Sequence, residues 1–284
     1  MGTLYREFTT QAELDAEYDV ERSVPDFDSY IARYERGNKR ALAELKPTLN
    51  LRYGGTRPEY LDFYPSDDEN APILVFFHGG YWRILSSGEF AFAALGPHAA
   101  GFSVANVNYG LCPSASMDEV VRQCRSSIAW LIRNTSLRFD RRRVLVGGHS
   151  AGAHLAAMCL MTDWEDVYDL PNECLAGGLL VSGLFDLRPL PYTFVQPSLQ
   201  LEPIQVIRNS PIMNMRGGLP PIHVTYGDQE PREFQRQSAD FAEGWQNIGN
   251  VATTFIQPDR NHFSAMFDFE TADSPLMKTL RSLV

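Results

Sequence analysis

A serine stands between small residues in the sequence GHSAG at positions 148–152. The residues just before it, 143–147 (RVLVG), are typical of a short buried strand, and residues 151–161 (AGAHLAAMCLM) of an apolar helix. A serine on so sharp a strand-to-helix turn needs neighbours without bulk two residues away, and Gly148 and Gly152 meet that need. The pattern therefore predicts a nucleophile elbow that presents the Ser150 hydroxyl beside the N–H groups at the start of a helix.

A serine hydroxyl is a weak nucleophile, so such an elbow requires a base, normally a histidine that an acid orients. With this kind of elbow the three residues follow one another along the chain as Ser, then Asp or Glu, then His. Of the six histidines, three follow Ser150. His154 lies on the helix after the elbow, and His223 lies inside an expected strand. His262 lies in a loop after the last expected strand, at the same edge of the sheet as Ser150, and is therefore the predicted base.

The sequence leaves three candidates for the acid. Asp186 follows the strand after the elbow, one strand earlier than is usual for this architecture. Asp228 and Glu230 both follow the next strand, in the sequence YGDQE. The usual turn is Gly-x-x-acid, which favours Glu230 and leaves Asp228 as a solvated loop carboxylate.

A pair of glycines follows the apolar stretch 73–77, in the sequence HGGYW. Glycines let the backbone turn its N–H groups toward a substrate, so we expect an oxyanion hole made by Gly79, Gly80 and Ala151. Removing one such donor costs about 3 kcal/mol of transition-state stabilisation. Tyr81 and Trp82, which complete the loop, are expected to contact the substrate. Arg83 follows them and has two interpretations, steering of a substrate carboxylate or an ordinary surface salt bridge.

Strands and helices alternate along most of the chain, which predicts an α/β fold with a mostly parallel sheet and right-handed crossovers. The first two strands alternate enough in polarity to be antiparallel edge strands, whereas the later ones are continuous apolar runs. Strands are expected at 50–53, 60–64, 72–77, 101–107, 143–147, 178–182, 222–226 and 251–256, and helices at 117–133, 151–161, 233–246 and 275–283.

Two segments fall outside this alternation. Residues 10–46 predict one or two helices lying over the domain and broken near Pro25, with apolar residues too sparse for a buried core. The proline-rich stretch 186–221 is too long for an ordinary connection and predicts a cap or lid insertion. Its Tyr192, Phe194 and Leu201 fit a pocket wall for an aromatic group, although core packing explains them equally well.

At 284 residues the chain is expected to form one large domain, 1–284. A net charge of −10 argues against nucleic-acid binding, and the one basic cluster, 141–143, is expected to be a solvated loop. No membrane span or signal peptide is expected, and the predicted compartment is the cytoplasm. The cysteines form no CxxC pair and no metal-ligand pattern, so free thiols and no metal site are expected at Cys112, Cys124, Cys159 and Cys174.

Four motifs together resemble the kynurenine formamidase (arylformamidase) branch of the α/β-hydrolases. They are HGGYW at 78–82, NYGLCP at 108–113, GHSAG at 148–152 and NHFS at 261–264, and the resemblance extends over nearly the whole chain. The hormone-sensitive-lipase-like branch usually has a third glycine at the position of Tyr81, so HGGxW is the more specific element. The stretch EPREFQRQS at 230–238 is also similar to the formamidase branch, in which the acid comes four residues before the phenylalanine; this implies Glu230. Many members carry Asp there, which keeps Asp228 as the alternative.

The resemblance implies an α/β-hydrolase fold, with a mostly parallel central sheet flanked by helices, a short cap insertion and N-terminal helices. It implies hydrolysis of an N-formyl or small N-acyl amide without a cofactor, and it is compatible with a homodimer. Ser150 would attack the carbonyl, His262 would transfer the proton, and Glu230 would orient the imidazole. One alternative is a short-chain carboxylesterase with the same triad. Another is a catalytically silent fold used for ligand or protein binding, which the complete set of motifs argues against.

Overall fold

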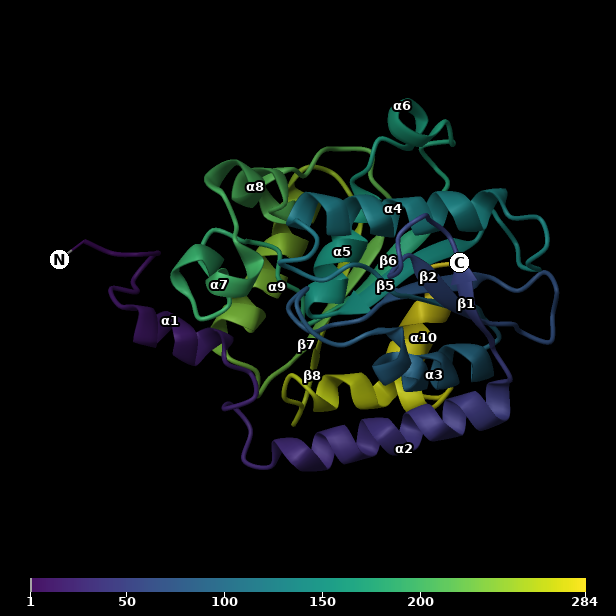
Figure 1. The fold of residues 1–284 in the computed structure, drawn as a ribbon, viewed down its shortest axis with the longest axis horizontal. Coiled ribbons are helices and arrows are strands. Elements are labelled where there is room, and N and C mark those ends of the chain that lie inside the picture. Colours follow the sequence, from purple (N-terminus) through teal and green to yellow (C-terminus); the bar gives the residue numbers. More distant parts are fainter. Residues whose placement is uncertain (1) are drawn as a thin grey trace.

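A central sheet of eight strands organises the computed structural model, which describes residues 2–284 (Figure 1). The strands are β1 (Thr48–Arg52), β2 (Tyr60–Tyr64), β3 (Ile73–Phe77), β4 (Ser103–Val107), β5 (Val144–His149), β6 (Gly177–Val181), β7 (Ile222–Gly227) and β8 (Ala252–Gln257). Their order across the sheet is β1-β2-β4-β3-β5-β6-β7-β8. The pairs β1–β2 and β2–β4 are antiparallel, and every other pair is parallel. The predicted mostly parallel sheet with two antiparallel strands is therefore confirmed, but only β1 of these two is an edge strand, since β2 lies between β1 and β4.

Helices cover both faces of this sheet. On one face lie α4 (Met117–Arg133), α5 (Ala151–Leu160) and α9 (Arg232–Asn247); on the other lie α2 (Phe27–Leu45), the 3-10 segment η1 (Ser87–Ala94), α3 (Leu95–Ala99), η4 (Ser264–Glu270) and α10 (Pro275–Ser282). Figure 1 shows α4 and α5 above the sheet and α2 and α3 below it.

Strand β3 shows why its sequence is apolar throughout. Ile73, Val75 and Phe77 belong to one hydrophobic core, and Leu74 and Phe76 belong to the core on the opposite face. Because successive strand residues point to opposite faces, a strand covered on both sides needs an apolar residue at every position. All five side chains are fully buried.

The N-terminal segment forms two helices, α1 (Gln11–Tyr18) and α2, separated by residues 19–26. A capping box between Thr10 and Glu13 begins α1. The expectation that this segment buries little is wrong, because Leu14 and Tyr18 are fully buried. The Tyr18 hydroxyl donates to Glu233 of α9 over 2.9 Å and accepts from Gln237. Packing against α9, far away in the sequence, therefore fixes the start of the chain.

The proline-rich stretch 186–221 contains four short helical segments rather than one long loop. They are η2 (Leu190–Tyr192), α7 (Gln196–Leu199), α8 (Pro203–Arg208) and η3 (Pro211–Met213). The remaining helix, α6 (Trp164–Tyr168), follows α5. The sequence did not predict η1, α3 or η4, because short helices of fewer than ten residues carry little periodic signal.

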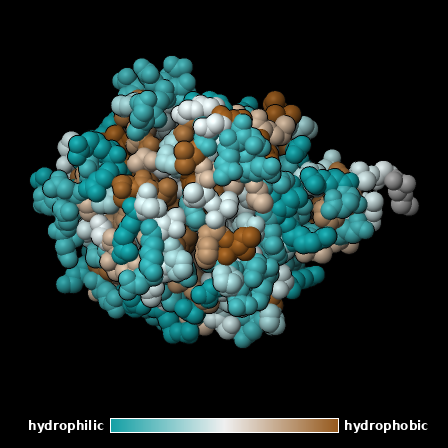
Figure 2. Space-filling model, turned by 180° about the vertical axis from the view of Figure 1, so that it is seen from behind, coloured by the Kyte–Doolittle hydropathy of each residue, from teal (hydrophilic) through white to brown (hydrophobic). Residues whose placement is uncertain are grey.

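Apolar side chains are scattered between hydrophilic ones on the face opposite to that of Figure 1 (Figure 2). Scattered single apolar residues are normal for a protein surface. The four cysteines are buried free thiols. Within residues 2–284, none of the helices combines the length and the hydropathy that crossing a bilayer requires.

The turn after β5 has the strained geometry that the GHSAG motif predicts. Ser150 has φ 56° and ψ −120°, a conformation that is costly for a residue with a side chain. A Cβ atom on Gly152 would overlap the carbonyl oxygens of Phe77 and His78, and one on Gly148 would overlap the backbone of Gly152. The two glycines are therefore required for β3, β5 and α5 to approach each other.

We expect Gly152→Ala to lower the free energy of unfolding by about 3 kcal/mol or more, since the added methyl group has no space and meets rigid backbone. Thermal and denaturant unfolding of the purified variant measure this loss. Gly55→Ala is the control, because a Cβ at that position meets nothing within 4 Å. Equal stability of the two variants would contradict the packing described for the elbow.

Candidate active site

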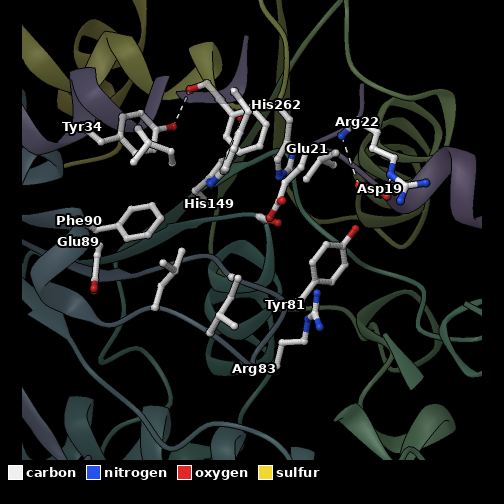
Figure 3. Close-up of a pocket in the computed structure, with 18 of the residues that line it drawn as sticks. Asp19, Glu21, Arg22, Tyr34, Tyr81, Arg83, Glu89, Phe90, His149 and His262 are labelled. Carbon is white, nitrogen blue, oxygen red and sulfur yellow. Dashed lines mark hydrogen bonds and ion pairs between the residues drawn. The ribbon is translucent and has the colours of Figure 1, made fainter. Parts of the chain in front are cut away.

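A cavity of about 380 Å³ lies at the carboxyl edge of the parallel strands (Figure 3). Ser150, which follows β5, and His262, which follows β8, both line it. Gly80 and Tyr81 contribute from the loop after β3. Parallel strands bring their carboxyl ends to one edge, so three loops that are distant in the sequence meet there.

Ser150 is held from both directions by the backbone. Its N–H donates to the carbonyl oxygen of Val181 on the neighbouring strand β6 over 2.9 Å, and its carbonyl oxygen accepts from Ala153 and His154 in α5. The residue is 3% exposed and lies at the wall of the cavity. The hydroxyl is thus fixed at the first turn of α5, where the N–H groups of the helix lack partners.

A buried carboxylate–imidazole pair lies at the same edge. His262 Nδ1 donates to Glu230 Oε2 over 2.7 Å, and the two residues are 2% and 4% exposed. The other oxygen, Oε1, accepts from Ser182 Oγ over 2.5 Å and from the Gly227 N–H over 2.7 Å. With its proton held on Nδ1, the imidazole presents an unprotonated Nε2 that can accept a proton from an alcohol.

The other two candidate acids lie elsewhere. Asp228 is exposed, although it is only two residues before Glu230. Asp186 is buried, but its carboxylate pairs with Arg188 over 2.7 Å and accepts from the Tyr5 hydroxyl over 2.7 Å. Among the three acids that the sequence left open, the structure places only Glu230 on His262.

Ser150 and His262 face the same cavity, but no hydrogen bond joins Oγ to Nε2 within residues 2–284. In ligand-free hydrolases this contact is often long and tightens only when substrate binds. The structure therefore holds the two side chains on one wall with the acid–base pair already formed.

Helix α2 holds the loop that carries His262. The Tyr34 hydroxyl donates to the carbonyl oxygen of Phe263 over 2.7 Å, an interaction drawn in Figure 3, and Asn261 donates to the Tyr30 hydroxyl over 2.7 Å. The carbonyl oxygen of His262 itself accepts from His149 Nε2 over 2.9 Å. Three consecutive residues of the loop are thus fixed by side chains from elsewhere.

The HGGYW loop brings unused N–H groups next to the serine. A Cβ on Gly79 would lie 3.4 Å from the Cβ of Ser150, so the two residues are adjacent. Gly80 has φ 109°, and His78 Nδ1 donates to the Gly79 carbonyl oxygen over 2.7 Å, which fixes the peptide group between the glycines. Within residues 2–284 the N–H groups of Gly79, Gly80 and Ala151 donate to no protein acceptor. This geometry suits an oxyanion hole.

The two aromatic residues of this loop have different positions. Tyr81 lines the cavity, and its hydroxyl donates to the Tyr18 carbonyl oxygen over 2.5 Å. Trp82 is fully buried outside the cavity wall and donates from Nε1 to His154 Nδ1 over 3.2 Å. His154 in turn donates to the Asn209 carbonyl oxygen over 2.7 Å. Trp82 therefore does not line the cavity, as a contact with substrate would require; it anchors the loop to α5 and the insertion.

Much of the cavity wall comes from the N-terminal segment, which local sequence patterns did not assign to the site. The stretch between α1 and α2 and the first two thirds of α2 supply Asp19, Val20, Glu21, Arg22, Phe27, Ile31, Tyr34, Glu35 and Asn38. From the insertion 186–221 only Phe194 lines the cavity, whereas Tyr192 is exposed and Leu201 is buried in the core. The spacing of Tyr30 and Tyr34 on one face of α2 was the available signal for this role.

The described residues 2–284 contain no group of three or more His, Cys, Asp or Glu side chains arranged to hold a metal ion.

Together, the sheet order and the elbow serine define an α/β-hydrolase of the serine-hydrolase type. The sequence profile of the BD-FAE family matches residues 61–175. A kynurenine formamidase of Danio rerio is 30% identical over 285 residues, which cover 96% of each chain, and that of Salmo salar is 31% identical over 90% of this chain and 88% of the relative. The chain belongs to the kynurenine formamidase family.

A solved structure from Silicibacter sp., of a protein assigned as a thioesterase, superposes on this fold with a TM-score of 0.83. The two chains are 25% identical, and the match covers 95% of this chain and 99% of the other. The predicted α/β-hydrolase fold and the family resemblance are thus confirmed.

The contacts of Glu230 and Asp228 generate a direct test of which acid serves His262. We expect Glu230→Gln to lower kcat by about 10³-fold or more, since an amide at this place disturbs the tautomer and the charge that the imidazole needs. Asp228→Asn is the matched control and is expected to stay within about twofold of the wild type, because its side chain is exposed. Steady-state kinetics on an activated acyl substrate measure both, and the reverse order of effects would exclude Glu230 as the orienting acid.

Buried histidines make the stability of this protein depend on pH. Burial lowers the pKa of His78, His154 and His223 from 6.5 to about 4. Between these values the unfolded chain binds more protons than the folded chain, so stability decreases as pH falls from 6.5 to 4. Each histidine contributes a loss of up to about 1.4 kcal/mol per pH unit in that window.

Urea unfolding at pH 7, 6, 5 and 4.5 measures this slope. His223→Gln, which removes one titrating group at a site away from the cavity, is expected to unfold with a shallower pH dependence than the wild type. A free energy of unfolding that stays constant between pH 7 and 4.5 would contradict this prediction.

Proposed function

We propose that this protein hydrolyses N-formyl or other small N-acyl amides of aromatic amines, with Ser150, His262 and Glu230 as a catalytic triad. The observation that carries the proposal is the buried Glu230–His262 pair on the cavity wall that also holds the elbow serine. The kynurenine formamidases among its relatives, which are similar over most of the chain, support an amide as the substrate.

In the first step the Ser150 oxygen attacks the carbonyl carbon of the amide. His262 Nε2 takes the hydroxyl proton, and the Glu230 carboxylate stabilises the resulting imidazolium through Nδ1. The carbonyl oxygen becomes an oxyanion that accepts hydrogen bonds from the N–H groups of Gly79 or Gly80 and of Ala151. These donors are free of protein acceptors within residues 2–284, so they need no rearrangement.

In the second step the bond between the carbonyl carbon and the nitrogen breaks. An amine anion is a poor leaving group, so His262 donates its proton to the nitrogen as the bond breaks. The amine leaves, and the acyl group remains as an ester on Ser150. Water then attacks this ester with His262 as the base, and the carboxylic acid, formic acid for a formyl group, is released.

The size and walls of the cavity support an aromatic leaving group. Its volume of about 380 Å³ lies within the range of small-molecule sites. Phe27, Phe90, Phe194 and Phe263 contribute apolar surface around the serine and the histidine. Figure 3 shows Phe90 and Tyr34 on the side of the cavity next to His149. An aromatic ring fits between such walls by offset or edge-to-face contact.

A second candidate is hydrolysis of short-chain esters or thioesters by the same residues. The Silicibacter neighbour, assigned as a thioesterase, favours this candidate. A side-by-side assay separates the amidase from the esterase or thioesterase. It uses formanilide, p-nitrophenyl acetate and an acetyl thioester, and it measures release of the acid directly. Amide rates near background with fast ester cleavage would favour the esterase.

We expect Ser150→Ala to lower kcat/KM for N-formyl amides by about 10⁴-fold or more, because the acyl-enzyme can no longer form. Labelling by a fluorophosphonate probe should disappear in the same variant. Ser136→Ala, which changes an exposed serine on a distant loop, is the control and should keep full activity and labelling. Retention of most turnover by Ser150→Ala would exclude the proposed mechanism.

A further inference from the structure

One arginine in the cavity wall has no partner for its charge. Two arginines line the cavity, Arg22 and Arg83. Arg22 pairs with Asp19 over 3.2 Å, and its side chain is 89% exposed. Arg83 is half-buried and forms no ion pair within residues 2–284, and its Nε is buried without an acceptor. A buried polar group without a partner is costly, so its presence requires an explanation.

The backbone fixes Arg83 close to the reacting centre. Its N–H donates to the Gly80 carbonyl oxygen over 3.0 Å, so Arg83 belongs to the same tight turn as the oxyanion-hole glycines. The guanidinium lies over the Phe194 ring, with 5.4 Å between its carbon and the ring centroid. Such stacking leaves the N–H groups at the edge of the guanidinium free for an acceptor in its plane. Figure 3 shows Arg83 next to Tyr81, on the other side of the cavity from His149.

The other charged residues that line the cavity differ from Arg83, because most of them are acids. Four acids line the cavity, and two of them have partners, since Asp19 pairs with Arg22 and Glu89 accepts from Ser86. Glu21 and Glu35 form no ion pair within the described residues. A carboxylate repels an anionic group that lies close to it, so the places next to Glu21 and Glu35 disfavour an anion. Among the described residues, Arg83 is the one cavity cation that no protein carboxylate neutralises.

We propose that Arg83 binds a carboxylate carried by the amine portion of the substrate and thereby determines which amides the enzyme prefers. A guanidinium fork matches the two oxygens of a carboxylate and gives a short, charge-assisted pair of hydrogen bonds. Because Arg83 and the oxyanion hole share one turn, this pair also places the scissile carbonyl relative to Ser150. The inference rests on the proposed amide hydrolysis and names its substrate class.

Two substrates that differ mainly in charge test this role. They are 2-formamidobenzoate, which carries the carboxylate, and 2-formamidobenzamide, which is neutral and of similar shape. We expect Arg83→Gln to raise KM for the carboxylate about tenfold to a hundredfold and to leave KM for the amide within about twofold. Arg83→Lys keeps the positive charge but lacks the planar fork, so its KM for the carboxylate should lie between those of the wild type and Arg83→Gln. Arg138→Gln, at an exposed arginine that does not line the cavity, is the control, and both substrates should keep their wild-type KM within about twofold.

Equal losses on both substrates in Arg83→Gln, or no loss on either, would overturn the role of Arg83. Melting temperatures of the two Arg83 variants show whether either one is misfolded. If Arg83→Gln is misfolded, Arg83→Lys is used for the same comparison of the two substrates.

Competitive inhibition separates this proposal from the proposed function. Hydrolysis of p-nitrophenyl acetate serves as the readout, with 2-aminobenzoate and 2-aminobenzamide as inhibitors, so no amide needs to be cleaved. Arg83→Gln should raise the inhibition constant of 2-aminobenzoate at least about tenfold and leave that of 2-aminobenzamide unchanged. If the wild type cleaves the ester and no formamide, the amidase proposal fails while this result still supports Arg83. If the wild type cleaves the formamides but Arg83→Gln changes the inhibition constants of both inhibitors equally, only the proposed role of Arg83 fails.

Discussion

The buried hydrogen bond between Glu230 and His262 is the interaction on which the site depends. A carboxylate removed from water is costly unless its oxygens are fully hydrogen-bonded, and here Ser182 and the Gly227 N–H satisfy the second oxygen. The sheet makes this possible, because β7 and β8 are neighbours whose carboxyl ends deliver the acid and the imidazole to one place. The tight packing behind the pair keeps its geometry without help from a ligand.

The register of the central strands accounts for the other half of the site. Phe77 of β3 pairs with Gly148 of β5, so the loop after one strand and the elbow after the other leave the sheet side by side. Glycine at 148 and 152 allows β3, β5 and α5 to approach each other closely, and the turn between β5 and α5 leaves Ser150 with a strained backbone. Strand pairing thus sets the distance between Ser150 and the free N–H groups of the HGGYW loop before any side chain is considered.

The sequence predicted the parts of the molecule that local patterns encode. The strands, the helix 117–133, the elbow and the loop carrying His262 follow from apolar periodicity and glycine spacing, and the Gly-x-x-acid turn favoured Glu230, which the structure places on His262. Contacts between distant segments were not predictable in this way. The N-terminal wall exists because Tyr18 binds α9, some 215 residues away, and Trp82 turns inward because His154 accepts its N–H. Residue type alone did not distinguish an inward ring from one that faces the cavity.

Helix α2 lines the cavity, and its Tyr34 and Tyr30 also form hydrogen bonds with the loop around His262. A substitution that displaces α2 would therefore alter the cavity wall and the contacts of the loop that carries the imidazole together. The shape of the cavity wall and the position of the His262 imidazole therefore depend on one and the same helix.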